Sequence, residues 1–468
     1  MIERSRIRAI HFVGIGGAGM SGIAEVLHNL GFGVTGSDLA ENDMVRHLRG
    51  LGITIFIGHR RENLGAAEVL VYSSAVRPEN EEVAEALARK IPVIPRAEML
   101  AELMRMKFSI CIAGTHGKTT TTSMIAAILS AARLDPTFVI GGKLASGGAG
   151  AAAGGAKLGY SQYLVAEADE SDGSFLKLLP VVAVITNIEN DHLDFYGSLR
   201  RLRGAFLDFA QKVPFYGAVV ANADCPNVRR IDSHIRKRII SYAIRREADY
   251  RAVRVRAAAF HCSYDLIIRG TASGPIELQV GGRHNVGNSL AAIAAAQAID
   301  IPLSTIRESL RTFRLPQRRF QVLYDDNERL VIDDYAHHPT EIKATLRTLR
   351  SRPGGGRIIA LFQPHRFTRL QSLMKQFATA FKGVDKVVVT KLYAANQPEI
   401  ENVNGRVLAE KIRAADRSTD VVYLEGDENI CGYLQTENRP GDAIVFLSAG
   451  NLTQLAHRFA DDLKRGKA

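Results

Sequence analysis

The sequence predicts an α/β protein of three domains, each built on a mostly parallel sheet. Short apolar strands alternate with helical segments along most of the 468 residues, which is typical of parallel sheets covered by helices. Glycine-rich turns follow two of the strands, in GIGGAG and in AGTHGKT. A chain of this length commonly holds about three domains, and its apolar fraction of 46% is enough to build a core in each.

The first domain is expected over residues 1–105. IRAIHFV is an apolar strand, GIGGAG follows it, and a helical pattern leads to a second strand, GFGVTGSD, which ends at Asp38. Strand and helix repeat through GITIFIG and EVLVYSSA, and IPVIPRAEMLAELM closes the domain with two prolines that suit a connector. This order predicts a Rossmann-like domain.

The central domain is expected over residues 106–316. KFSICIAG is a predicted strand, and a predicted helix over 119–132 begins directly after the second glycine turn. SQYLVAEADE and VVAVITNI are further strands, separated by a Gly/Ala-rich segment, 141–156, that we expect to be a loop. Residues 239–280 are rich in strands with local antiparallel pairing, and HNVGNSLAAIAAAQAI is a helix. A strand, a glycine turn and a helix in succession predict a domain like that of P-loop ATPases.

The third domain is expected over residues 317–468. After LRTFRLPQRRFQ the alternation restarts, with strands at RLVIDD, RIIALF, KVVVT, VVYL and GDAIVFLSAG. Helices are predicted over 339–350 and 366–381, after KVVVT, and after the last strand. The alternation predicts a second Rossmann-like domain.

The composition favours a cytoplasmic protein. Its cysteines are scattered, form no C-x-x-C, and argue against a disulfide framework or a cysteine metal site: Cys111, Cys225, Cys262 and Cys431. No apolar run approaches the ~18 residues that span a membrane, and the N-terminus shows no signal-peptide pattern. We expect no membrane insertion, and a monomer or weak homodimer.

A formal net charge of +11 indicates anionic partners. Basic residues are densest over 229–256, where we find no nucleic-acid-binding motif. A solvated basic face, with affinity for anionic small molecules, is therefore favoured over a nucleic-acid-binding ATPase. No nucleic acid is expected as a partner.

The segment AGTHGKTTTT has the parts of a phosphate-binding loop but is shorter than usual. The pattern G-x-x-x-x-G-K-[ST] would need glycine where Ile112 stands. A strand, a tight turn, the N–H groups of a helix N-terminus, a lysine and a hydroxyl are nevertheless present. A threonine-rich helix cap, the structural alternative, rarely carries G-K-T after a strand. We predict that a nucleoside triphosphate binds here, with Lys118 also a candidate catalytic residue, at Gly114, Thr115, His116, Gly117, Lys118, Thr119 and Thr120.

Two further side chains are expected beside the phosphates. Glu167 lies at the end of one predicted strand, and His192 follows the next. In an open α/β sheet the carboxyl ends of strands face the ligand. With Thr119 they are predicted to hold Mg²⁺, and His192 is also a candidate catalytic residue. An acidic loop and a lone histidine are each commonly structural, but their combination with the phosphate-binding loop favours a site.

The first glycine turn allows two interpretations. GIGGAG fits G-x-G-x-x-G at Gly14, Gly16 and Gly19, and Asp38 lies where an acid would bind ribose. Taken alone, this favours NAD(P) and a dehydrogenase. The same geometry also holds any other pyrophosphate.

Taken together, the motifs resemble the Mur ligase superfamily over nearly the whole chain. In order they are GIGGAGMSG, GSD, SSA, PRAEML, AGTHGKTTT, EADESD, TNIENDHLD, GRHNVGNSLAA, RRFQ, DDYAHHPTE and QPHRFTR. The resemblance implies that ATP, with Mg²⁺, phosphorylates the lactyl carboxylate of UDP-N-acetylmuramate. The amine of L-alanine then attacks the acyl phosphate to form an amide.

The resemblance also implies where the two nucleotides bind. The UDP-sugar is expected at Gly14, Ile15, Gly16, Gly17, Ala18, Gly19, Met20, Ser37, Asp38, Ser73, Ser74 and Arg96. Beyond the phosphate-binding loop, ATP is expected to contact Asn285, Asn288, Arg318 or Arg319, and Asp334.

The amino acid must be held by its carboxylate while its amine stays neutral. Arg366 and Arg369, in QPHRFTR, could form the bidentate contact to a carboxylate that arginine favours. Tyr335 or Asp334 could also contact the amino acid. The candidates for orienting the amine or stabilising the oxyanion are His337, His338 and His365. Adjacent side chains point different ways, so at most one of His337 and His338 is expected to face the site.

The chain departs from the superfamily's pattern at a few positions. Residues 193–211 contain no lysine, where several Mur ligases carry a carbamylated lysine, and this supports the alanine-adding branch. Asn396 and Gln397 stand where that branch more often has Gly-Glu, which leaves the role of the tract open. Gly287 either allows close approach of a ligand or has no role. A ligase that recycles a murein tripeptide would share most motifs, but it usually has bulkier residues in the first glycine turn.

Overall fold

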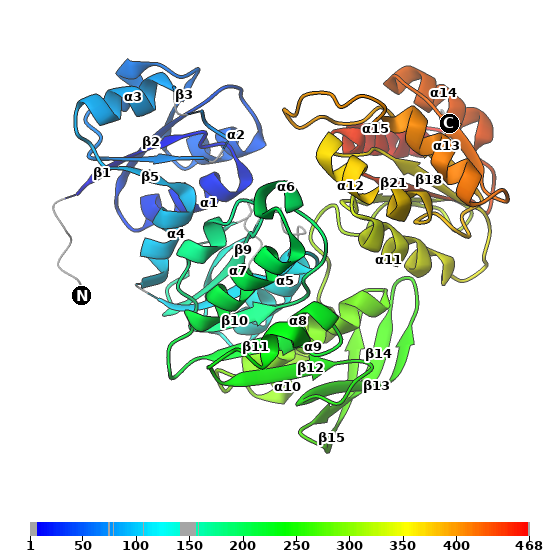
Figure 1. Cartoon of the computed structure of the whole chain (residues 1–468), viewed down its shortest axis with the longest axis horizontal. Helices are drawn as coiled ribbons and strands as arrows, with labels where there is room; N and C mark the ends of the chain where they lie inside the picture. Colours follow the sequence, from blue (N-terminus) through cyan, green and yellow to red (C-terminus); the bar gives the residue numbers. More distant parts are fainter. Residues whose placement is uncertain are drawn as a thin grey trace. The chain divides into compact units, whose positions relative to one another are not determined.

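The computed structural model describes residues 7–73, 75–77, 79–105, 107–140, 156–157 and 159–466, which form an α/β protein with three mostly parallel sheets (Figure 1). The predicted fold class is therefore confirmed. Main-chain contacts group the chain into two compact units, the first made of Met1–Val253, Leu266–Ile276 and Gly287–Arg314, the second of Arg254–Asp265, Glu277–Val286 and Leu315–Ala468. The expected domain boundaries after residues 105 and 316 stay predictions.

The first sheet has the strand order β3-β2-β1-β4-β5 and is parallel throughout. Its strands are β1 (Ala9–Val13), β2 (Gly33–Asp38), β3 (Thr54–Ile57), β4 (Val69–Tyr72) and β5 (Val93–Pro95). The connections contain α1 (Ala18–Asn29), α2 (Asp43–Gly50), η1 (Arg61–Leu64) and α3 (Glu81–Ala88), and α4 (Arg96–Arg105) follows β5. This is the Rossmann-like order, in which ligands bind after β1, where the strand order reverses.

The segment expected to be a proline-containing connector forms the edge strand β5 instead. Val93 pairs with Leu70 and Pro95 with Tyr72. An edge strand leaves one row of N–H groups unpaired, so the N–H that Pro95 lacks costs no ladder hydrogen bond there.

The second sheet has the order β15-β14-β13-β12-β11-β10-β6-β9-β7-β8. Its strands are β6 (Phe108–Ala113), β7 (Thr137–Val139), β8 (Ala156–Lys157), β9 (Tyr163–Ala168), β10 (Val182–Ile185), β11 (Ala218–Asn222), β12 (Ile239–Ala243), β13 (Tyr250–Ala257), β14 (Cys262–Ile268) and β15 (Thr271–Leu278). Its helices are α5 (Lys118–Ala131), η2 (Ser174–Lys177), α6 (Leu193–Tyr196), α7 (Leu199–Gln211), α8 (Pro226–Asp232), α9 (Arg283–Gln297) and α10 (Leu303–Thr312). Residues 141–155 of the expected Gly/Ala-rich loop lie outside the described residues.

The expected antiparallel pairing over 239–280 is wrong for its first pair, because β12 and β13 run parallel, with Tyr242 opposite Tyr250. Side-chain hydrogen bonds hold the connection between these two strands. Asp249 Oδ2 accepts from the N–H of Ser241 at 2.8 Å, and Asp224 Oδ2 accepts from the N–H of Ile244 at 2.7 Å. Such local side-chain bonds compete with a hairpin and are hard to foresee from strand propensity.

The third sheet has the order β16-β17-β21-β18-β19-β20, in which only the β16–β17 pair of the described strands is antiparallel. Its strands are β16 (Gln321–Asp325), β17 (Leu330–Asp334), β18 (Ile358–Phe362), β19 (Lys386–Val389), β20 (Asp420–Tyr423) and β21 (Ala443–Leu447). One face is covered by α11 (Pro339–Arg350), α12 (Phe367–Ala378) and α13 (Gly405–Ala415), the other by α14 (Asp427–Glu437) and α15 (Leu452–Lys464). The helices that follow the neighbouring strands β18 and β21 therefore lie on opposite faces of the sheet. In such a sheet a crevice forms between the carboxyl ends of the two strands.

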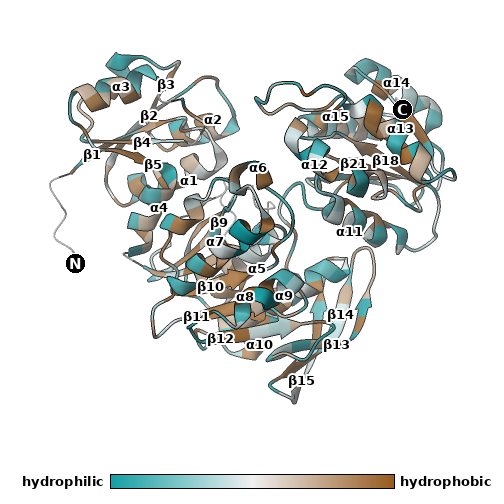
Figure 2. Ribbon diagram, viewed as in Figure 1, coloured by the Kyte–Doolittle hydropathy of each residue, from teal (hydrophilic) through white to brown (hydrophobic). Residues whose placement is uncertain are grey.

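The apolar side chains lie where this layering requires. In Figure 2 strands such as β10 and β11 are brown, β13 and β15 carry more teal, and the helices alternate between brown and teal, as helices with one buried face do. Among the described residues, no helix combines the length and the apolar character needed to cross a bilayer.

Candidate active site

The predicted phosphate-binding turn lies between the central strand β6 and the helix α5. Gly114 has a φ of +137° and Gly117 a φ of +82°, conformations that disfavour any side chain. A Cβ at Gly114 would overlap Thr186 Oγ1, and one at Gly117 would lie 2.5 Å from Asn288 Oδ1. The first turn of α5 carries no acidic residue, so its N–H groups and dipole suit an anion. The short loop therefore has the geometry of a phosphate site.

The loop that follows β10 holds this turn in place. Asn187 accepts from the N–H of Thr115 through its carbonyl, at 3.1 Å, and from the N–H of His116 through Oδ1, at 2.8 Å. Thr186 Oγ1 donates to the carbonyl of His116 at 2.6 Å, and the N–H of Glu189 donates to Thr115 Oγ1 at 2.9 Å. Sequence reasoning missed Thr186 and Asn187. Their position, polar and directly after a strand that neighbours β6, was the available clue.

Lys118 is anchored to acidic residues that follow β9. Its Nζ lies 2.8 Å from Glu170 Oε2 and 2.7 Å from the carbonyl oxygen of Gly114. Burial alone would lower the pKa of the Lys118 ammonium, but the negative charges of Glu170 and Asp169 outweigh burial and raise that pKa. The lysine is thus a fixed positive charge beside the turn, and Glu170 is a partner that sequence reasoning missed.

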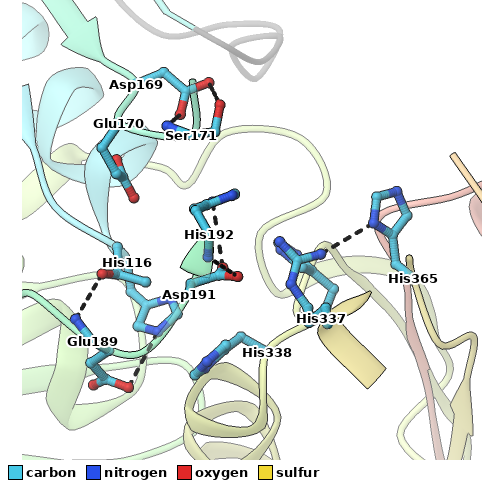
Figure 3. A network of polar contacts seen from close by, with 12 residues as sticks. His116, Asp169, Glu170, Ser171, Glu189, Asp191, His192, His337, His338 and His365 are labelled. Atoms are coloured by element: carbon cyan, nitrogen blue, oxygen red, sulfur yellow. Dashed lines mark hydrogen bonds and ion pairs between the residues drawn. The ribbon is translucent and has the colours of Figure 1, made fainter. Parts of the chain in front are cut away.

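Glu170 and Asp169 present two carboxyl groups to the single positive charge of Lys118, and Asp169 also accepts from Ser171 (Figure 3). Glu170 is 1% exposed, and its Oε1 has no hydrogen-bond partner among the described residues. Burial raises the pKa of the Glu170 carboxyl, with Lys118 opposing. Burial also opposes ionisation of Asp169, but Lys118 and the N–H of Ser171 outweigh it and lower its pKa. A buried, unsatisfied carboxylate oxygen fits a hard divalent cation such as Mg²⁺.

The predicted metal ligands come from three elements. Thr119 lies in the first turn of α5, Glu167 in β9, and His192 directly before α6. His192 has a φ of +55°, and its Nε2 lies 3.5 Å from Asp191 Oδ2. Among the described residues, Glu167 and His192 belong to no set of three acidic, cysteine or histidine side chains with ligand atoms within 4.8 Å of one another. Within the described part of the chain, Glu167 and His192 thus form no closed cage, an arrangement that suits Mg²⁺, a cation that keeps water and phosphate ligands.

The asparagines predicted to contact ATP have different surroundings. Asn288, on α9, is 8% exposed and lies against Gly117 of the phosphate-binding turn. Asn285 is 2% exposed, and its Nδ2 donates to the carbonyl of Gly281 at 2.7 Å. Asn288 therefore lies at the turn, whereas the amide of Asn285 supports the start of α9. Thr120, in the first turn of α5, is 6% exposed.

The first glycine turn is held by the end of β2. The N–H groups of Gly14 and Ile15 donate to the carbonyl of Ser37, at 2.8 and 3.0 Å. The N–H of Gly16 donates to Asp38 Oδ2 at 2.8 Å. Three N–H groups of the turn are thus bound within the protein, and one oxygen of Asp38 stabilises the turn.

The remaining residues of the predicted UDP-sugar site lie around the glycine turn and after β4. Arg96, the first residue of α4, reaches the turn, since a Cβ at Gly19 would lie 2.5 Å from Arg96 Nη1. The side chains of Ile15 and Met20 are 0% and 1% exposed, so only their backbone could contact a ligand. Gly17 caps α1, which begins at Ala18, and the N–H of Ser73 donates to Val13 after β4. Ser74 lies outside the described residues.

In the second unit, two arginines flank Tyr335. The guanidinium carbons of Arg318 and Arg319 lie 4.9 and 5.1 Å from the centroid of the Tyr335 ring, a cation–π geometry. The Nη2 of Arg318 also donates to the carbonyl of Ser448 at 2.7 Å. Arg318 thus donates to the backbone of the third domain, and the contact of Arg318 or Arg319 with ATP stays a prediction.

Asp334, at the end of β17, is buried and hydrogen-bonded. Thr345 Oγ1 donates to its Oδ2 at 2.7 Å, and the N–H of Ala336 donates to its Oδ1 at 3.1 Å. Burial nevertheless raises the pKa of the Asp334 carboxyl to about 6. The carboxyl is 7% exposed, so its main contacts are within the protein.

The adjacent histidines differ in role, as expected. His338 caps α11, with its Nδ1 accepting from the N–H of Thr340 and Glu341 closing the capping box. His337 Nδ1 lies 2.9 Å from the carbonyl of Tyr335. A carbonyl only accepts, so Nδ1 carries the proton and, in the neutral ring, Nε2 is an acceptor.

His365 and Arg366 stand where β18 turns into α12. Arg369 Nη1 lies 3.2 Å from His365 Nδ1, and arginine only donates, so the neutral His365 carries its proton on Nε2. The His365 ring stacks on Tyr393 with centroids 5.5 Å apart, and the N–H of Arg366 donates to the carbonyl of Tyr393 at 2.9 Å. Arg366 has a φ of +68°, a strained conformation that this bond supports. Arg369 is 7% exposed and holds His365.

The local structure of the tract after β19 accounts for Asn396 and Gln397, which depart from the superfamily's pattern. Gln397 Oε1 accepts from the N–H of Thr368 at 3.2 Å, in the first turn of α12, and a glutamate could accept the same bond. Asn396 has a φ of +64°, where glycine is favoured and asparagine is tolerated. Both substitutions therefore preserve the local structure.

The chain matches three family models, described as Mur ligase family, catalytic domain (residues 9–108), Mur ligase middle domain (112–296) and Mur ligase, glutamate ligase domain (318–450). UDP-N-acetylmuramate–L-alanine ligases of Sulfurihydrogenibium sp. (strain YO3AOP1) and Geobacter sp. (strain M21) are 48% identical to it, with 98–99% of each chain covered. The crystal structure of the UDP-N-acetylmuramate–alanine ligase of Thermotoga maritima is similar with a TM-score of 0.83, at 30% identity over 98% of this chain and 100% of that one. A murein peptide ligase from Psychrobacter arcticus is similar with a TM-score of 0.72, at 26% identity over 97% and 98%.

Proposed function

The chain belongs to the Mur ligase family, and we propose that it joins L-alanine to the lactyl carboxylate of UDP-N-acetylmuramate, with conversion of ATP to ADP and phosphate. The reaction serves peptidoglycan precursor synthesis in the cytoplasm. The observation that carries the proposal is the phosphate-binding turn, in which Lys118 pairs with Glu170. The full-length relatives of the chain are named UDP-N-acetylmuramate–L-alanine ligase. The carboxylate is first phosphorylated, and the amine of L-alanine then displaces phosphate from the acyl phosphate.

Lys118 stabilises the charge on the transferred phosphoryl group. Phosphoryl transfer depends mainly on positioning and charge neutralisation, which a buried and permanently charged lysine provides. The phosphates of ATP accept the hydrogen bonds that Glu170 and the carbonyl of Gly114 accept in the structure. The rest of the turn, with Thr120 and Asn288, shapes the pocket for ATP.

Mg²⁺ is held, in this proposal, by Thr119, Glu167 and His192, beside the unsatisfied oxygen of Glu170. When bound, the cation neutralises phosphate charge and lets the sugar carboxylate approach ATP. Glu170 offsets the positive charge of Lys118 when no nucleotide is present.

Two histidines of the third domain, His337 and His365, have opposite hydrogen-bonding capacities, and these suit two steps. His337 Nε2 is an acceptor and takes the proton that the attacking amine must lose. His365 Nε2 is a donor and stabilises the oxyanion of the tetrahedral intermediate. Arg366 binds the carboxylate of L-alanine, Arg369 positions His365, and Tyr335 lines the site.

The UDP-sugar binds at the first glycine turn, beside Arg96 and the N-terminus of α1. This observation also bears on the dehydrogenase alternative. In a dinucleotide site the acid after the second strand must bind ribose. Asp38 instead binds the N–H of Gly16, which favours the ligase.

The tripeptide-recycling ligase remains the second candidate, because a murein peptide ligase shares the fold. Its TM-score of 0.72 at 26% identity, against 0.83 at 30% for the alanine ligase of Thermotoga maritima, favours L-alanine. We take the protein as a monomer or weak homodimer that binds neither nucleic acid nor membrane.

Phosphate release tests the proposal. ATP, Mg²⁺ and UDP-N-acetylmuramate are incubated with and without L-alanine, and NADH absorbance is followed in parallel. Release that requires both the sugar and L-alanine supports the ligase. Release that requires a murein tripeptide moves the protein to the recycling branch, and NAD(P) reduction without phosphate release rejects a ligase altogether.

A further inference from the structure

A buried carboxylate joins four segments of the first domain, beneath its glycine turn. Glu82, in the first turn of α3, is 0% exposed. Ser37 Oγ donates to its Oε2 at 2.5 Å, and Asn63 Nδ2 donates to its Oε1 at 2.6 Å. His11 Nε2 and His59 Nδ1 lie 3.4 and 3.6 Å from Oε2. Neither the family's chemistry described above nor the sequence motifs assign a role to this group.

The hydrogen bonds keep Glu82 ionised. The N–H of Arg60 adds a third donor, 3.2 Å from Oε1. Burial alone would raise the pKa of the Glu82 carboxyl, but hydrogen bonds from His11, Ser37 and Asn63 outweigh burial and lower it. An ionised carboxylate only accepts hydrogen bonds.

This fixes the direction of a short hydrogen-bond chain. The single hydroxyl proton of Ser37 is donated to Glu82, so Ser37 Oγ can only accept from its other neighbour. That neighbour is His59 Nδ1, at 2.9 Å. Nδ1 of His59 must therefore carry a proton, and in the neutral ring Nε2 is the acceptor.

The same serine supports the glycine turn through its backbone. The carbonyl of Ser37 accepts from the N–H groups of Gly14 and Ile15. His59 follows β3, and Ser37 lies near the end of β2, so both stand at the carboxyl edge of the sheet, where ligands bind in this fold. Glu82 thus acts on both the turn and the imidazole through one residue.

We propose that Glu82 is a positioning residue for the UDP-sugar: through Ser37 it holds His59 in the Nδ1–H tautomer and fixes the glycine turn at the sheet edge. The part that concerns the UDP-sugar rests on the proposed function. The tautomer does not. A metal site is the weaker explanation, because His11, His59 and Glu82 do not form a set with ligand atoms within 4.8 Å among the described residues.

The isosteric variant Glu82→Gln reverses the chain. The amide oxygen must stay on Arg60 and Asn63, which both donate, so the amide NH₂ faces Ser37 and donates to it. Ser37 then donates to His59 Nδ1, and the imidazole proton moves to Nε2. ¹⁵N NMR of histidine-labelled protein at about pH 8, where an imidazole is neutral, distinguishes protonated from unprotonated ring nitrogens. His59 is assigned with a His59→Gln variant.

Glu25→Gln is the matched control. Glu25 Oε2 lies 3.1 Å from His47 Nε2 in the same domain, and neither residue bonds to the glycine turn or belongs to the proposed sites. We expect an Nδ1–H pattern for His59 in the parent and in the control, and an Nε2–H pattern in Glu82→Gln. An Nε2–H pattern in the parent, or no change in the variant, overturns the proposal.

Steady-state kinetics test the second half. Glu82→Gln should raise KM for the UDP-sugar about tenfold, the effect of losing one hydrogen bond to a charged group, while kcat and the KM values for ATP and L-alanine stay within about twofold. Equal losses in all parameters, or none, would show that Glu82 only stabilises the fold. If the parent is inactive, the proposed function fails while the NMR result still decides the tautomer. If Glu82→Gln does not fold, Ser37→Ala replaces it. An unchanged KM for the UDP-sugar in that variant overturns the proposal.

Discussion

At the scale of single residues, the ion pair between Lys118 and Glu170 is the main contact beside the phosphate-binding turn. Lys118 and Glu170 are 52 positions apart and meet at 2.8 Å because β6 and β9 are neighbours in the sheet. The lysine could be predicted from its motif, but its partner could not, because the pairing is made by the fold. The same holds for Thr186 and Asn187, and for Ser37 with Glu82.

Lys118→Ala is expected to abolish ATP-dependent phosphate release without unfolding the protein. Glu170 already has a raised pKa, so it can protonate when its partner is removed. Phosphate release and the circular-dichroism melting curve measure the two effects. Lys107→Ala, which removes a lysine bound to the carbonyl of Ser161 in the same domain, is the control and should stay active. Near-normal turnover in Lys118→Ala would reject the assignment.

Arg366→Ala is expected to raise KM for L-alanine tenfold or more, which is roughly the affinity lost when a charge-assisted bidentate contact is removed. The KM for ATP should not change. Arg366→Lys keeps the charge but loses the planar fork, and should recover only part of the affinity. An unchanged KM for L-alanine in the alanine variant would refute the clamp.

Asp334 should make stability depend on pH. Its folded pKa, about 6, lies above the ~3.9 of an unfolded aspartate, so its contribution is fully present below about pH 4 and is lost as pH rises to about 6. About two pKa units correspond to roughly 3 kcal/mol. Asp334→Asn keeps the shape, so its free energy of unfolding relative to the parent should increase over this range and then level off. Urea unfolding at a series of pH values measures this, and parallel pH profiles would contradict it.

At the scale of elements, helix ends and loop chemistry decide what the sequence could predict. The prediction of a helix over 339–350 is confirmed as α11, because proline and a capping box mark its start. β5 was missed because its proline suggested a connector. The parallel pairing of β12 and β13 was not foreseen, because side-chain hydrogen bonds such as that of Asp249 to Ser241 leave no clear sequence signal.

Gly287, inside α9, offers a test at this scale. A Cβ there would meet only Ile244 Cδ1, at 3.9 Å, an ordinary contact. Gly287→Ala is therefore expected to stabilise the protein by about 0.5–1 kcal/mol, through the helix propensity of alanine. Chemical unfolding measures the gain. A higher KM for ATP in the variant would show that a ligand approaches this backbone closely, and an unchanged KM would show that the glycine has no such role.

At the scale of the whole molecule, the three sheets provide three carboxyl edges, and we propose that a different ligand binds at each. The first carries a glycine turn supported from Ser37, the second a phosphate-binding turn with Lys118, and the third the histidine pair with Arg366. The fold class and the location of each turn could be predicted from strand–helix alternation and glycine motifs. The tautomers of His337 and His365 required the structure, because backbone and arginine partners set them.

The central claim, that this chain activates a carboxylate with ATP for attack by L-alanine, is tested most directly with an isotope. UDP-N-acetylmuramate labelled with ¹⁸O in the lactyl carboxylate is incubated with ATP, Mg²⁺, L-alanine and the protein, and phosphate and nucleotide products are analysed by mass spectrometry. An acyl phosphate requires that one labelled oxygen leaves with phosphate while the amide product keeps the other. Labelled phosphate together with the alanyl product would agree with the account. Unlabelled phosphate, or no alanyl product, would contradict it.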